Sequence, residues 1–170
     1  MSGTGAGKSS CMCFLKYKNM KKILVVQGGG RAHGNTAQLV EQFKQGAEEA
    51  GNQIEVISLI KHQVNGCLGC NACRYGKPCV QNDCFNEMIP KIMEADCIVF
   101  ASPLYYWSIS SRLKAFLERF YSIAQSDPHP AMGRVEKYPE KDSALLMTAA
   151  ANTFWVFEQS VGFYRFSIVN

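Results

Sequence analysis

Residues 21 to 40, KKILVVQGGGRAHGNTAQLV, decide the fold. The stretch begins with two lysines and a short run of β-branched and other apolar residues, which predicts a buried strand. A glycine-rich turn follows. The helical spacing of Val40, Phe43, Ala47 and Ala50 then predicts a helix, which Gly51 ends. The stretch therefore predicts a strand, a turn and a helix in that order.

The rest of the chain repeats this alternation. Further strands are predicted over residues 53–59, within 96–106 and over 143–150, and further helices over 85–95, 110–123 and 153–169. Strands that are apolar throughout and that alternate with helices favour a parallel sheet covered on both faces. We therefore predict an α/β fold, a doubly wound parallel sheet in a three-layer α/β/α arrangement.

Composition and charge limit the classes of function. The chain has 170 residues, 47% of them hydrophobic and 19% charged, as expected for one globular domain. The net charge of +4 comes from scattered lysines and arginines, which gives little support for nucleic-acid binding. No apolar run approaches the ~20 residues that a membrane span needs. Without a clear secretory signal, a cytoplasmic protein is expected.

The first residues resemble a phosphate-binding P-loop only in part. Gly7, Lys8 and Ser9 match the end of that motif, but no strand precedes them, and a P-loop needs one. We therefore expect residues 1–19 to be a flexible leader and residues 20–170 to form the domain.

The turn QGGGRAHGNT, residues 27–36, follows the first predicted strand, where doubly wound domains bind ligands. Its glycines allow the backbone to approach a ligand closely. Asn35 or Thr36 is expected to cap the helix, with Gln38 as the capping-box partner of Asn35. Free N–H groups at a helix start suit a phosphate, and Arg31 can add a charge-assisted bond. The alternative is a connecting turn that binds nothing.

The segment SPLYYWSISS, residues 102–111, follows the third predicted strand. Three consecutive aromatic residues, Tyr105, Tyr106 and Trp107, lie where a ligand would bind, so a flat conjugated ring can stack there. The alternative is an aromatic cluster that covers the edge of the sheet. Taken with the glycine-rich turn, the segment suggests a ligand with a phosphate at one end and a flat ring at the other.

Four pieces of the chain, in order, resemble the flavodoxin-like NAD(P)H-dependent FMN reductases, a family that includes the iron–sulfur flavoproteins. The pieces are residues 21–39, the cysteine loop that begins at residue 66, residues 95–120 and residues 145–153. The resemblance implies a bound FMN that NAD(P)H reduces. The acceptor would be a quinone, a nitro or azo compound, free flavin or a protein. No side chain is expected to act as an acid or base, because the cofactor carries the chemistry.

The resemblance also implies which residues contact FMN. They are Gly29, Arg31, Gly34, Asn35, Thr36, Pro103, Leu104, Tyr105, Tyr106, Trp107, Ala149 and Ala150. The family commonly has serine and proline where Gly29 and Gly30 stand here, which removes one hydroxyl ligand. Family members generally continue past Asn170 into a fifth strand and a last helix. We therefore expect a domain that lacks both, and a homodimer or tetramer with FMN near the interface.

The stretch GCLGCNACRYGKPC, residues 66–79, has the spacing C-x2-C-x2-C-x5-C. Its cysteines are Cys67, Cys70, Cys73 and Cys79. A [4Fe–4S] cluster requires four thiolates, and zinc can use the same four sulfurs. Free or redox-active thiols in a compact glycine-containing turn are a further alternative. The spacing matches the cluster motif of the iron–sulfur flavoproteins.

Three functions thus remain open. The chain is an FMN-dependent oxidoreductase, an electron carrier with a [4Fe–4S] cluster and a protein donor, or a non-catalytic module that has lost its cofactor. Two further cysteines, Cys84 and Cys97, are not expected to bind metal. Cys97 is expected to be a small buried residue of the third strand.

Overall fold

A computed structural model describes residues 20–73, 77–123 and 140–166, and the predicted leader lies outside these residues. The strands are β1 (Lys22–Gln27), β2 (Gln53–Ser58), β3 (Cys97–Pro103) and β4 (Asp142–Thr148). The α-helices are α1 (Asn35–Glu49), α2 (Phe85–Glu94), α3 (Ser111–Glu118) and α4 (Glu158–Tyr164). The described residues also contain two short 3₁₀ helices. The first, η1 (Arg119–Ser122), directly follows α3, and the second, η2 (Phe154–Phe157), leads directly into α4.

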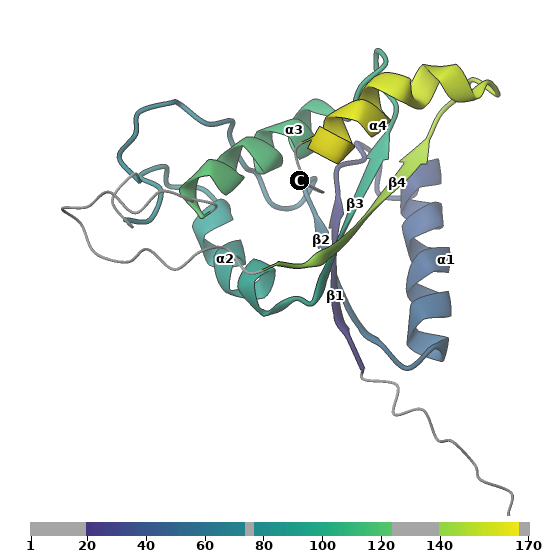
Figure 1. Ribbon diagram of the computed structural model, residues 1–170, viewed down its shortest axis with the longest axis horizontal. Helices are drawn as coiled ribbons and strands as arrows, with labels where there is room; N and C mark the ends of the chain where they lie inside the picture. Colours follow the sequence, from purple (N-terminus) through teal and green to yellow (C-terminus); the bar gives the residue numbers. More distant parts are fainter. Residues whose placement is uncertain (1–19, 74–76, 124–139, 167–170) are drawn as a thin grey trace, which may run out of the picture.

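The four strands form one parallel sheet in the order β2-β1-β3-β4. Helix α1 covers one face, and α2 and α3 lie on the other (Figure 1). This is the strand order of a flavodoxin-like doubly wound domain. The predicted α/β fold is confirmed.

The apolar run in β1 is continuous because each face of the sheet has its own core. Ile23 and Val25 point to the cluster under α1, which includes Val40 and Val99. Leu24 and Val26 point to the larger cluster under α2 and α3. Successive side chains of a strand alternate between faces, so a strand covered on both sides needs apolar residues at every position.

The predicted capping box of α1 is wrong. The N-cap is Gly34, which is extended and offers no side-chain bond, so Asn35 already lies inside the helix. The Gln38 N–H bonds to the carbonyl of Gly34 at 3.0 Å, as an ordinary helical hydrogen bond. The first-turn N–H groups of α1 therefore receive no side-chain cap from the described residues.

Two predicted helices are shorter or interrupted. The helix expected over residues 110–123 leaves α geometry after Glu118 and ends as η1. The helix expected over residues 153–169 begins as η2, and α4 starts only at Glu158. Aromatic and β-branched residues lose rotamer freedom in an α-helix, and η2 consists of four such residues, FWVF.

The turn after β1 packs closely against the start of α3. The hydroxyl of Ser110, the N-cap of α3, donates to the carbonyl of Gly28 at 2.8 Å and accepts from the Leu113 N–H at 3.2 Å. A Cβ atom on Gly28 would lie 2.7 Å from both Leu113 Cβ and Ser110 Oγ. Only glycine fits at this junction, which fixes the glycine-rich turn relative to the loop after β3.

Replacing Gly28 by alanine is therefore expected to lower the free energy of unfolding by about 1–3 kcal/mol, the usual cost of overpacking. Urea denaturation measures this difference. Gly46→Ala is the matched control, because a Cβ on Gly46 meets nothing within 4 Å and alanine favours the helix. Equal stability of Gly28→Ala and the wild type would show that the junction is loose.

Candidate functional site

A pocket with about 330 Å³ of space opens at the carboxyl ends of β1, β3 and β4, and we call it the strand-end pocket. Its lining residues are Gly29, Gly30, Arg31, Gly34, Asn35, Thr36, Pro103, Leu104, Tyr105, Thr148, Ala149 and Ala150. This volume lies within the range of small-molecule sites. The structure thus brings together ten of the twelve residues proposed for FMN.

Tyr106 and Trp107 do not line this pocket. Tyr105 and Ser108 pair as an isolated bridge, with N–H to carbonyl bonds of 2.9 and 3.1 Å, so Tyr106 and Trp107 form the tip of a tight hairpin. Both have positive φ, 51° and 60°, as the two central residues of a type I′ turn do. Tyr106 is 91% exposed. The hairpin leaves these two residues outside the pocket lining, and periodicity alone could not show that.

Sequence analysis missed Gly30 and Thr148 as lining residues. Thr148 is the last residue of β4, and its hydroxyl lies 2.8 Å from that of the buried Thr36. Its carbonyl accepts the Leu104 N–H at 2.7 Å. The position of Thr148 at a strand end was the available signal, since parallel strand ends meet at one edge of the sheet.

The end of the strand-end pocket nearest α1 is suited to an anion. The uncapped first turn of α1 carries N–H groups and the positive end of the helix dipole. Arg31 is exposed beside this turn, with its Cβ close to Gly34. No carboxylate of the described residues forms an ion pair with Arg31. The opposite part of the lining is apolar, from Pro103, Leu104 and Ala149.

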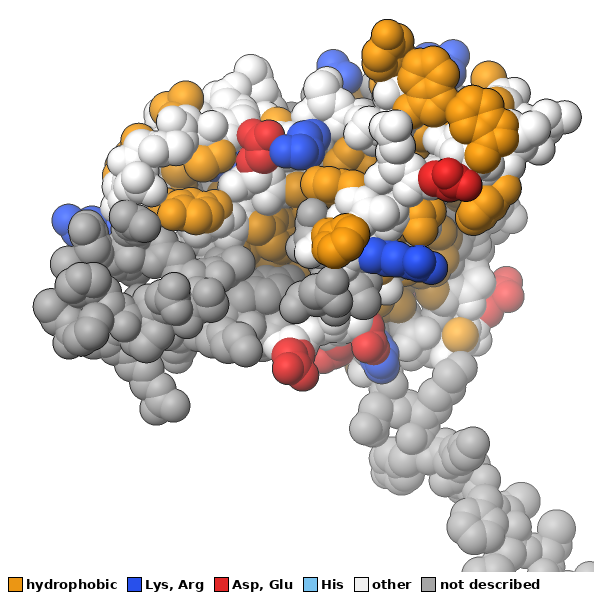
Figure 2. All heavy atoms as spheres, turned by 45° about the horizontal axis from the view of Figure 1, so that its top comes forward, with side chains coloured by type: hydrophobic (Ala, Val, Ile, Leu, Met, Phe, Trp, Pro, Cys, Tyr) orange, Lys and Arg blue, Asp and Glu red, His pale blue; other side chains and the backbone are white. Residues whose placement is uncertain are grey.

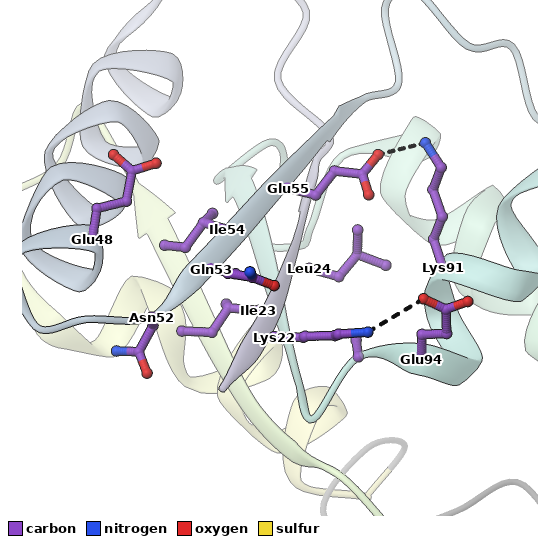
Figure 3. Close-up of a pocket in the computed structure, with 11 residues that line it drawn as sticks. Lys22, Ile23, Leu24, Glu48, Asn52, Gln53, Ile54, Glu55, Lys91 and Glu94 are labelled. Carbon is purple, nitrogen blue, oxygen red and sulfur yellow. Dashed lines mark hydrogen bonds and ion pairs between the residues drawn. The ribbon is translucent and has the colours of Figure 1, made fainter. Parts of the chain in front are cut away.

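A larger hollow, about 560 Å³, lies at the opposite edge of the sheet, where β1 and β2 begin. Figure 3 shows that its charged side chains pair with one another: Lys91 with Glu55, and Lys22 with Glu94 at 3.6 Å. Ligands of doubly wound domains bind at the carboxyl ends of the strands. Its position and its paired charges make this hollow a poorer candidate than the strand-end pocket.

A second candidate site involves the cysteines. Cys67, Cys70, Cys73 and Cys79 all line one small pocket, which we call the cysteine pocket, together with Arg119 and Tyr121. Cys67 and Cys70 are exposed, and Cys73 is buried. Burial raises the pKa of the Cys73 thiol, and the neighbouring Cys79, Cys67 and Cys70 raise it further. A cation would be needed to hold these sulfurs together as thiolates.

The thiols do not converge as the ligands of a single ion. Among the described residues, no three Cys, His, Asp or Glu side chains are placed to hold one metal ion. Zinc needs its sulfurs around one point at about 2.3 Å, so the structure gives no support to the zinc alternative. A [4Fe–4S] cluster binds one thiolate at each of its four irons, which keeps the sulfurs further apart. Four cysteines line one pocket, which is the number of thiolates that such a cluster requires.

A buried ion pair closes the base of the cysteine loop. Arg119 Nη1 donates to Asp83 Oδ2 at 2.6 Å and to the Asn65 carbonyl at 3.1 Å, and the Asp83 carboxylate also accepts the N–H groups of Asn65 and Phe85. Burial raises the pKa of Asp83, but the bonds from Arg119 and these N–H groups outweigh it, so the pKa lies below its ordinary value. Residues 65 and 83 are thereby held against η1.

Further side chains anchor the loop to α2, α3 and η1. The Glu118 carboxylate accepts the Cys67 N–H at 3.2 Å, and the Tyr121 hydroxyl donates to the Asn71 side chain at 3.3 Å. Asn86 donates to the Cys79 carbonyl at 2.8 Å. Hydrogen bonding by Lys114 is the main cause that lowers the pKa of Glu118. These hydrogen bonds hold the described part of the cysteine loop against α2, α3 and η1. The cysteine spacing did not predict them.

The other two described cysteines lie outside the cysteine pocket. Cys97 begins β3 and is half-buried, rather than fully buried as expected, and burial raises the pKa of its thiol. Cys84 is the half-buried N-cap residue of α2. Neither residue is a candidate ligand by position.

The family model for NADPH-dependent FMN reductase matches residues 21–136 of this chain. The chain belongs to the NADPH-dependent FMN reductase family. It is 36% identical over 98 residues to the iron–sulfur flavoprotein MJ1083 of Methanocaldococcus jannaschii, covering 58% of this chain and 51% of that protein. It is 33% identical over 107 residues to YwqN of Bacillus subtilis, a proposed NAD(P)H-dependent FMN-containing oxidoreductase, covering 63% and 55%.

Solved structures support the same fold for this FMN reductase family member. The NAD(P)H:quinone oxidoreductase from Methanothermobacter marburgensis has a TM-score of 0.67 at 17% identity, covering 88% of this chain and 75% of that one. RosB, solved with a bound riboflavin-phosphate derivative, has a TM-score of 0.67 at 20% identity, covering 88% and 59%. The chain spans about half the length of the relatives named above. No helix in its described residues has the length and apolar character of a membrane span.

Proposed function

We propose that this protein is an FMN-dependent oxidoreductase that takes electrons from NAD(P)H and passes them to a quinone, a nitro or azo compound, free flavin or a protein. The observation that carries the proposal is the strand-end pocket, which combines an uncapped helix start with an apolar wall at the carboxyl edge of the sheet. The family of the chain supports the same reading. FMN, when bound, supplies the electron-transfer chemistry.

In this proposal, the residues of the chain bind FMN and orient it. The N–H groups of the first turn of α1 would hold the phosphate together with three side chains, those of Arg31, Asn35 and Thr36. Backbone N–H, guanidinium, amide and hydroxyl groups all donate to anions. Pro103 to Tyr105, with Ala149 and Ala150, would hold the ring and exclude water. The described lining contains no carboxylate, histidine or lysine, so an acid or base role is assigned to none of its residues.

The direct test is to titrate purified protein with FMN and follow the quenching of flavin fluorescence. Anaerobic addition of NADPH or NADH should then bleach the visible flavin absorbance. Saturable binding at micromolar FMN with bleaching by either nucleotide is expected. If FMN does not bind, the alternative of a module without its cofactor takes precedence. Binding without bleaching would contradict the proposed electron donor.

Restoring a hydroxyl at position 29 should tighten FMN binding. Gly29 lines the pocket, its backbone lies outside the left-handed region, and an added Cβ would lie 3.4 Å from Thr36 Cβ, an ordinary contact. A hydrogen bond to a charged group contributes about 1.5–3 kcal/mol, so Gly29→Ser should raise the affinity roughly tenfold or more. Fluorescence titration measures the change, and Gly46→Ser on α1 is the control. A weaker affinity would place the phosphate elsewhere.

A second candidate function is an iron–sulfur electron carrier. The observation that favours it is that four cysteines and the buried Arg119 line one pocket. The cysteine pocket would hold a [4Fe–4S] cluster that exchanges electrons with FMN or with a protein donor. Iron and sulfide analysis of anaerobically purified protein tests this candidate. About four irons per chain would support it, and absence of iron after reconstitution would reject it.

The proposed partners include a second copy of the chain, as a homodimer or tetramer. Large exposed side chains near the strand-end pocket support this, among them Tyr106, Phe154 and Trp155. Figure 2 shows hydrophobic side chains gathered at the upper right, where Figure 1 places η2 and α4. Light scattering coupled to size-exclusion chromatography measures the oligomeric state, and a monomer at micromolar concentration would contradict the proposal.

A further inference from the structure

Arg119 has donors that the Asp83 ion pair does not use. Its side chain is 1% exposed and lies 4.9 Å from the Phe85 ring centroid. Only Nη1 bonds to Asp83 and to the Asn65 carbonyl. Nε and Nη2 are buried and have no hydrogen-bond partner in the structure. A buried N–H without a partner costs about 1–3 kcal/mol, more for a charged group, so such donors call for an acceptor.

The cysteine pocket borders Arg119. The residue lines the pocket together with all four cysteines of the loop. The guanidinium also interacts with Cys79. Burial lowers the pKa of Arg119, but Asp83 and then Cys79 outweigh this effect, and the pKa lies above its ordinary value. Cys79 is thus a sulfur with which the guanidinium already interacts and toward which an unused donor can turn.

We propose that Arg119 is a positioning residue of the cysteine pocket, whose Nε–H and Nη2–H groups donate to the sulfur atoms of an anionic iron–sulfur centre. The proposal rests on the second candidate function stated above. It adds a role that the cysteine spacing does not contain, since Arg119 comes 40 residues after Cys79 in the chain. The Asp83 ion pair holds the guanidinium through Nη1, which leaves Nε and Nη2 to donate to another acceptor.

The role of Arg119 would be electrostatic. Adding one electron to a thiolate-bound cluster increases its negative charge, and hydrogen bonds to sulfur stabilise the more negative state. A buried guanidinium also loses little of its effect to solvent. Arg119 should therefore make reduction of the centre more favourable, while Cys67, Cys70, Cys73 and Cys79 alone determine whether iron binds.

The test compares reconstituted variants. The whole protein is loaded anaerobically with ferrous iron and sulfide, its iron is counted, and the midpoint potential of the centre is measured by titration with dithionite. Arg119→Lys keeps a cation beside Asp83 but lacks the two extra donors. It should bind as much iron as the wild type, with about tenfold less favourable reduction, which is about 59 mV for one electron.

Two further variants separate this role from a structural one. The double variant Asp83→Leu with Arg119→Met removes both buried charges together, a change that proteins often tolerate, and it should shift the potential in the same direction. Tyr121→Phe alters the same pocket and loosens the loop at Asn71 without touching Arg119, so its potential should equal that of the wild type.

The outcomes distinguish the two levels of the proposal. Lower potentials in both Arg119 variants, with Tyr121→Phe unchanged, are expected. Wild-type potentials in the Arg119 variants would overturn the role of Arg119 and leave the cluster in place. Failure of the wild type to take up iron would overturn the cluster candidate and this inference with it, without bearing on FMN binding at the strand-end pocket.

Discussion

Replacing Asp83 by asparagine should lower the free energy of unfolding by about 3–5 kcal/mol, the usual cost of breaking a buried ion pair. The variant leaves the guanidinium of Arg119 buried without a counter-charge, and both side chains of the wild-type pair are at most 5% exposed. Urea denaturation followed by circular dichroism measures the loss. Glu49→Gln, at an exposed position on α1, is the control and should stay within about 0.5 kcal/mol of the wild type.

The same pair gives the stability a defined pH dependence. The pKa of Asp83 is lower in the folded protein than its ordinary value of about 3.9. Its contribution is therefore complete above about pH 4 and disappears as the pH falls through the lower, folded-state pKa. Wild-type stability should fall over this acidic range more steeply than that of Asp83→Asn. Parallel curves for the two proteins would show that Asp83 is not the group responsible.

The strands were predictable because each carries its own signal. In β1, every residue from Ile23 to Val26 is apolar, and the structure shows that each face of the sheet buries two of them. A run of this kind is required wherever a parallel strand has helices on both sides. Parallel strands end at the same edge of the sheet, so the loops that follow them lie close together. This is why ten of the proposed FMN contacts line one pocket.

Long-range polar pairs were not predictable in this way. Asp83 and Arg119 are 36 residues apart, and neither lies in a recognisable motif. The available signal was the position of Arg119, three residues after the buried Phe116, on the side of the helix that faces the core. A charged residue at such a position indicates a buried partner, but the sequence does not say which of 14 acidic residues supplies it.

The backbone conformation of the aromatic segment, residues 105–108, could not be predicted from periodicity either. Tyr106 and Trp107 adopt positive φ, which sequence patterns favour for glycine or asparagine and not for aromatic residues. Three adjacent aromatic residues therefore suggested one stacking surface, whereas the hairpin divides them. Tyr105 lines the strand-end pocket, and the other two are exposed and lie outside its lining. Local propensity is overridden here by the hydrogen bonds between Tyr105 and Ser108.

Removing the side chains of Asn35 and Thr36 together should weaken FMN binding by at least about a hundredfold. Each side chain would lose a hydrogen bond to a charged phosphate, worth about 1.5–3 kcal/mol, and tenfold in affinity corresponds to about 1.4 kcal/mol. The fold should persist, because alanine favours the helix interior and, among the described residues, the bond between Thr36 and Thr148 is the one side-chain hydrogen bond lost. Titration of Asn35→Ala with Thr36→Ala by flavin fluorescence measures the effect.

Two controls make this last prediction specific. Thr36→Ser keeps the hydroxyl beside Thr148 and should retain most of the affinity. Gln38→Ala alters an exposed residue of the same helix turn, outside the pocket lining, and should leave the affinity unchanged. Iron uptake should be the same in all variants, because the cysteine pocket is lined by Arg119 and Tyr121, beyond the end of α3, and shares no residue with the strand-end pocket. Unchanged FMN affinity in the double variant would mean that the phosphate does not bind at the start of α1.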